Sequence, residues 1–76
     1  MSFSAKPAQR DRVRSLMRDL ELDPRNITLM HKPALKRAGL WADAYQGTSV
    51  DALIDRLSYG QASALIDALV AQVGDA

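Results

Sequence analysis

The chain contains no cysteine among its 76 residues, which excludes disulfide bonds and thiolate metal sites. This absence suits a reducing compartment, and we expect a cytoplasmic protein. No apolar run approaches the roughly 20 residues that span a membrane. The N-terminal residues also lack the apolar core of a signal peptide. We therefore expect a protein without membrane contact.

The residues that catalysis most often needs are also scarce. His31 is the only histidine, and without a cysteine it suggests no ordered nucleophilic pair or triad. We interpret it as a surface or half-buried turn residue. The four glycines are scattered rather than gathered in a phosphate-binding loop, and three aspartates, Asp51, Asp55 and Asp67, are ordinary residues of helix starts and solvent faces. We expect a non-enzymatic protein without cofactor or metal.

Aromatic residues make up only 5% of the chain, although hydrophobic residues make up 47%. Aliphatic side chains must therefore fill a single modest core, in a chain near the lower size limit for unaided folding. No segment of useful length alternates with the period of a β-strand. We predict one all-α domain of three main helices plus a short fourth element, with residues 1–5 frayed.

The clearest helix follows Ser58. Gln61 stands three residues after this serine, which is the spacing of a capping box. Behind the box, apolar residues recur at spacings of three and four, and Gly74 is expected to end the helix. They are Ala62, Leu65, Ile66, Leu69, Val70 and Val73.

Similar signals predict the other helices. Pro7 suits the first position of a helix, and Thr48 with Asp51 forms a cap-like pair. The last two helices meet near Ser58, which predicts a sharp helical corner. The expected helices span residues 7–21, 33–38, 49–57 and 59–73. The expected core comprises Val13, Leu16, Met17, Leu20, Ile27, Leu29, Leu35, Leu40, Trp41, Val50, Leu53, Ile54, Leu57, Leu65, Ile66, Leu69 and Val73, with Met30 beside it.

Charge is unevenly distributed along the chain. Residues 1–38 hold nine Lys/Arg and four Asp/Glu, whereas residues 39–76 hold one Arg and five Asp. The two halves either attract each other within the fold or present a basic surface to a partner.

If the basic half binds a partner, nucleic acid is our leading hypothesis. Phosphate binding needs several cations on one surface without exact spacing. Asp11 is placed to pair with Arg14, which lowers the local potential. The predicted nucleic-acid contacts are Lys6, Arg10, Arg14, Arg18, Arg25, Lys32, Lys36 and Arg37.

The alternative is a protein-interaction module, either an adaptor or an inhibitor. Its docking surface would be the acidic C-terminal half or the patch from Leu40 to Tyr45, with Trp41 and Tyr45 as partner-binding residues. A helix-turn-helix is a further possibility, but the helix over residues 61–73 lacks Lys and Arg and suits packing better than DNA reading. Either a monomer or a homodimer is compatible with this length.

Residues 57–69 follow the pattern Leu-(Ser/Thr)-x-x-(Gln/Glu)-Ala-Ser-x-Leu-Ile-Asp-x-Leu. This pattern is similar to the closing helix of a small helical module that is common in phage-encoded proteins, and both ends of the chain resemble that module. Residues 5–9 and 13–17 resemble its opening, whereas residues 27–47 have no counterpart. Such modules occur on phage recombination and single-strand-annealing proteins and in Mu-type regulatory proteins. The resemblance implies a setting near phage DNA transactions and no catalytic residues.

Overall fold

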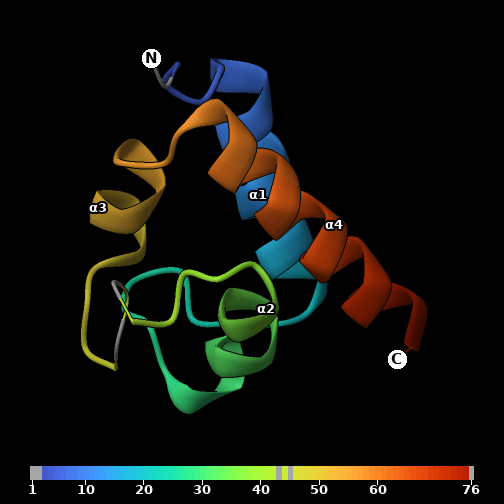
Figure 1. Ribbon diagram of the computed structural model, residues 1–76. Coiled ribbons are helices and arrows are strands. Elements are labelled where there is room, and N and C mark those ends of the chain that lie inside the picture. The colour runs from blue at the N-terminus through green and yellow to red at the C-terminus, as the bar shows by residue number, and fades with distance from the viewer. Residues whose placement is uncertain (1–2, 43, 45, 76) are drawn as a thin grey trace.

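The computed structural model in Figure 1 describes residues 3–42, 44 and 46–75. Over these residues the protein is a small all-α domain with four α-helices and no strand, as predicted. A 3-10 turn, η1, runs directly into the second helix. The elements are α1 (Pro7–Asp19), η1 (Leu29–His31), α2 (Lys32–Arg37), α3 (Val50–Asp55) and α4 (Tyr59–Asp75).

The predicted capping box of α4 is present. The Ser58 N–H donates to Gln61 Oε1 at 2.9 Å, and the Gln61 N–H donates to Ser58 Oγ at 3.1 Å. Two other end signals were misjudged. The cap of α3 is Ser49 rather than Thr48, since Ser49 Oγ accepts from an α3 N–H at 3.4 Å. α4 passes through Gly74, which lacks the positive φ of a terminating glycine.

The ends of α1 and α2 share one geometry, the Schellman motif. After α2, Gly39 has φ 76° and the Leu40 N–H returns to an α2 carbonyl at 2.8 Å. After α1, the same positive φ falls on Glu21, at 57°, and the Leu22 N–H donates to the Met17 carbonyl at 2.9 Å. Glu21 therefore occupies a left-handed position that glycine normally fills.

Two short antiparallel backbone contacts hold the ends of α3. Asn26 pairs with Ser49 before the helix, and Ser4 pairs with Ser58 after it. Ala5, next to the second contact, is buried. Ser4 and Ala5, at the end of the segment expected to fray, thus lie against the chain between α3 and α4.

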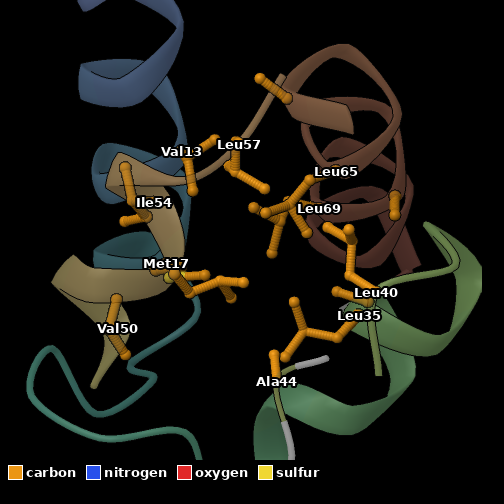
Figure 2. Close-up of a cluster of buried hydrophobic side chains, with 14 of the residues drawn as sticks. Val13, Met17, Leu35, Leu40, Ala44, Val50, Ile54, Leu57, Leu65 and Leu69 are labelled. Carbon is orange, nitrogen blue, oxygen red and sulfur yellow. The ribbon is translucent and has the colours of Figure 1, made fainter. Parts of the chain in front are cut away.

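The core lies between the helices, where α4 packs against α1 and α2 and α3 packs against α1 (Figure 1). Figure 2 shows side chains from all four helices converging on this space. Most of the predicted core is buried, but Leu20, Trp41 and Ile66 are only partly buried. The core also contains residues beyond the predicted set: Leu22 and the alanines Ala5, Ala34, Ala44, Ala62 and Ala68.

Leu29, Met30 and Val73, expected in or beside the core, and Val70 of the predicted apolar stripe are exposed instead. Leu29 and Met30 are 61% and 64% exposed, and Val70 and Val73 lie on the outer side of α4. The local apolar pattern did not predict the exposure of these four residues. Side chains from neighbouring elements fill the core in their place, and a local pattern does not show those elements. In the described part of the chain, no helix is long and apolar enough to cross a membrane.

Candidate interaction surface

The basic strip predicted along α1 is partly neutralised by the fold. The Arg14 guanidinium lies 3.3 Å from Asp51 Oδ1, 3.9 Å from Asp55 Oδ1 and 3.9 Å from Asp11 Oδ1. The Asp11 pair was predicted, whereas the two α3 aspartates come from 37 and 41 residues further along the chain. Around Arg14 the basic and acidic halves of the chain therefore attract each other within the fold. This was one of the two interpretations of the charge pattern.

The other predicted cations of α1 face different neighbours. Lys6 Nζ lies 5.8 Å from the centroid of the Tyr59 ring, at the start of α4. Arg10 is half-buried, and Arg18 is exposed near the other end of α1. The strip from Lys6 to Arg18 is thus divided between α4, α3 and solvent, with acidic groups beside its centre.

A second basic surface lies on the continuous helical segment formed by η1 and α2. Exposed and buried residues alternate along this segment with helical spacing. The inner side comprises His31, Ala34 and Leu35, all buried. We call the other side the outer face; it comprises Leu29, Met30, Lys32, Pro33, Lys36 and Arg37, all exposed.

Every ion pair in the described ranges involves Arg14. The cations of the outer face therefore pair with no carboxylate in those ranges. The surrounding sequence explains this. Residues 24–42 contain four Lys/Arg and no Asp or Glu, so the other 57 residues hold six Lys/Arg and nine Asp/Glu. The positive charge of the chain is therefore concentrated around the outer face.

His31 fixes the start of this segment from inside. It is 1% exposed, so its interpretation as a surface or half-buried turn residue is wrong. The Thr28 N–H donates to His31 Nδ1 at 3.0 Å, and His31 Nε2 lies 3.0 Å from the Asp23 carbonyl oxygen. A backbone N–H only donates and a carbonyl only accepts, so these partners require the neutral Nε2–H tautomer.

The turn before the segment is capped by Asp23. Asp23 Oδ1 accepts from the Arg25 N–H at 2.7 Å and from the Asn26 N–H at 3.5 Å. The Arg25 N–H bond is the main reason why the pKa of the Asp23 carboxyl lies below its ordinary value of 3.8. The turn and the histidine together hold Leu29 and Met30 on a defined backbone.

The predicted partner-binding patch is mostly interior. Leu40 and Ala44 are buried, and Trp41 is half-buried against the core. Lys32 Nζ lies 5.7 Å from the centroid of the Trp41 ring, so the indole supports a cation at the edge of the outer face. Tyr45, the other predicted contact, lies outside the described residues.

A hollow of about 600 Å³ lies between the end of α1 and the start of α3. Its apolar lining comes from Met17, Leu22 and Val50, and its rim carries Arg18 and Glu21 among other charged groups. The rim carries charges of both signs, so the hollow favours neither anions nor cations. In the ranges that the structure describes, no group of three His, Asp or Glu residues is placed to hold a metal ion.

Comparison with protein-family models, curated proteins and solved structures finds no match to this chain. The outer face is the feature that sequence reasoning missed. A signal was present, since Ala34 and Leu35 follow His31 at spacings of three and four and define an inner side. Leu29 and Met30 fall outside that side, but the burial of His31 was needed to see it.

Proposed function

We propose that this domain is a non-enzymatic interaction module that docks a partner protein through the outer face. One observation carries the proposal. Two adjacent large apolar side chains, Leu29 and Met30, are exposed on a backbone held by a buried histidine. Clustered apolar side chains on a rigid surface are typical of protein-binding sites.

The resemblance of the C-terminal helix suggests the setting. We propose that the partner belongs to phage-type DNA transactions in the cytoplasm, where this domain serves as an accessory module. The matching residues in that helix cap it and pack it, so the resemblance supports the setting rather than the surface. The docking surface is proposed from the geometry of η1 and α2 alone.

A peptide-display selection tests the docking surface. Random peptides would be selected on the wild-type domain and then tested on two double variants. Leu29→Ser/Met30→Ser removes the apolar end of the outer face, and Phe3→Ser/Val70→Ser removes exposed apolar side chains elsewhere. We expect most selected peptides to lose binding only to the first variant. Equal loss on both variants, or no loss on either, would refute the docking surface.

Nucleic-acid binding is the second candidate, and the cations of the outer face, which pair with no described carboxylate, favour it. Because Arg14 is paired with aspartates, the phosphate contacts would move from α1 to Lys32, Lys36 and Arg37. Affinity for single- and double-stranded DNA, measured over a salt series, would then fall steeply with salt. It would also fall in Lys36→Glu/Arg37→Glu more than in Arg14→Ala/Arg18→Ala. Absence of binding at low salt would exclude this candidate.

A further inference from the structure

We infer that the segment docking on the outer face is acidic and amphipathic, with apolar side chains at one end and carboxylates one and two helical turns away. This inference rests on the proposed function and specifies the chemistry of the partner. It follows from the order of side chains along the outer face and from the local imbalance of charge.

The order of side chains sets the spacing. Leu29 and Met30 lie at the start of the segment, Lys32 follows, and Lys36 and Arg37 lie one turn beyond Lys32. At about 1.5 Å per residue, the distance along the axis from the apolar end to the last cation is roughly 12 Å. A partner helix of two to three turns is therefore long enough to contact both ends.

The charge of the outer face selects the sign of the partner. Its cations face no described carboxylate, and residues 24–42 contain no acidic residue. A basic partner would meet like charges at Lys32, Lys36 and Arg37, whereas carboxylates would find three cations that pair with no described carboxylate. The domain thus attracts acidic segments at this face, although its net charge is only +1.

The apolar end distinguishes a protein partner from other polyanions. Phosphates of a nucleic acid would use the cations but leave Leu29 and Met30 in water. The Trp41 ring beside the face is half-buried and has Lys32 above it, so it offers no open stacking surface. On an anionic membrane, the exposed apolar side chains of the face that could insert and anchor it are these two. An amphipathic peptide uses both parts of the face.

Three synthetic helical peptides of about three turns test the sign of charge. The first carries two apolar residues followed by glutamates one and two turns later, the second has lysines in place of the glutamates, and the third has serines in place of the apolar pair. We expect measurable binding of the first peptide only, with affinity that falls as salt is added. The readout is fluorescence anisotropy, with chemical-shift mapping by NMR to locate the contact.

A charge exchange gives the sharpest control. Lys36→Glu/Arg37→Glu should lower the affinity for the glutamate peptide by about tenfold or more, since each exposed pair contributes a modest amount and both signs are reversed. This variant should bind the lysine peptide instead. Arg12→Glu/Arg56→Glu makes the same change in net charge outside the outer face and should leave the affinity unchanged. Circular dichroism of every variant checks that it is folded.

Each other outcome overturns the acidic partner. If both charged peptides bind and both depend on Leu29 and Met30, the face docks proteins without selecting charge, and the proposed function survives alone. If DNA or anionic vesicles bind through the same cations while no peptide binds, the ligand is a polyanion rather than a protein. If no probe binds the face, the acidic partner is refuted, and the display selection decides separately whether the face docks proteins at all.

Discussion

Replacing His31 with leucine tests whether the buried imidazole holds the start of the outer face. Leucine is apolar and comparable in bulk, so it fills most of the space without contacting the two backbone partners. The Thr28 N–H and the Asp23 carbonyl then lose the hydrogen bonds that the ring nitrogens provide. We expect the domain to fold but to be less stable.

The magnitude follows from those two backbone groups. Leaving a buried polar group without a partner costs about 1–3 kcal/mol, and the partly buried position of both bonds favours the lower half of that range. The added apolar burial of leucine returns about 1 kcal/mol. The expected net loss is about 2 kcal/mol, a substantial part of the roughly 4–11 kcal/mol typical of 76 residues.

Urea and thermal unfolding followed by circular dichroism measure this loss. About 2 kcal/mol corresponds to a decrease in Tm of roughly 8–16 °C for a domain of this size. Leu29→Ser, at the exposed neighbour, is the control and should change stability by less than about 0.5 kcal/mol. If His31→Leu is as stable as the wild type, the imidazole is not the support described above. Long-range ¹H–¹⁵N spectra of the wild type should independently show the Nε2–H tautomer.

Three further changes have expected outcomes. Glu21→Gly should stabilise the domain by up to about 1 kcal/mol, because glycine adopts the left-handed conformation without strain. Gly39→Glu, at the equivalent position after α2, should destabilise it. Thermal unfolding of both variants measures the two changes. Asp23 has a lowered pKa, so its charge stabilises the fold at pH values above its ordinary pKa of 3.8, and this effect is lost as the pH falls through the folded pKa. The difference in stability between wild type and Asp23→Asn should therefore shrink in acid. A difference that does not change with pH would contradict this. A double-mutant cycle of Arg14→Ala and Asp51→Ala should give a coupling energy of at most about 1 kcal/mol that decreases with salt, and a larger, salt-independent coupling would mean that the pair is not exposed as described.

The parts of the fold that the sequence predicted depend on short-range chemistry. The capping box of Ser58 and Gln61 lies within four residues, and the apolar period of α4 lies on one helix. Such patterns need no knowledge of the neighbouring elements. Glycines were less reliable, since Gly39 has a positive φ after α2 whereas Gly74, expected to end the last helix, lies within α4. The φ of Glu21 had no compositional signal at all.

The candidate site depends on contacts that the sequence does not reveal. Arg14 belongs to the predicted nucleic-acid surface until the fold brings Asp51 and Asp55 beside it. The burial of His31 likewise depends on a carbonyl eight residues earlier in the chain. The absence of acidic residues from 24–42 could be read directly. The side to which the cations of this segment point could not be read from the sequence, because tertiary packing sets the orientation of the segment.

The buried histidine and the exposed apolar pair have a common physical explanation. Apolar side chains on a loosely held turn would tend to collapse onto the core, which reduces their exposure to water. Here the bonds of His31 to both sides of the turn oppose such a movement, so Leu29 and Met30 remain exposed at 61% and 64%. A partner that binds them meets an already ordered surface and loses less conformational entropy on docking. His31→Leu should therefore weaken the glutamate peptide even under conditions in which the variant is fully folded. Unchanged affinity in the folded variant would show that the exposure of the apolar pair does not depend on the histidine.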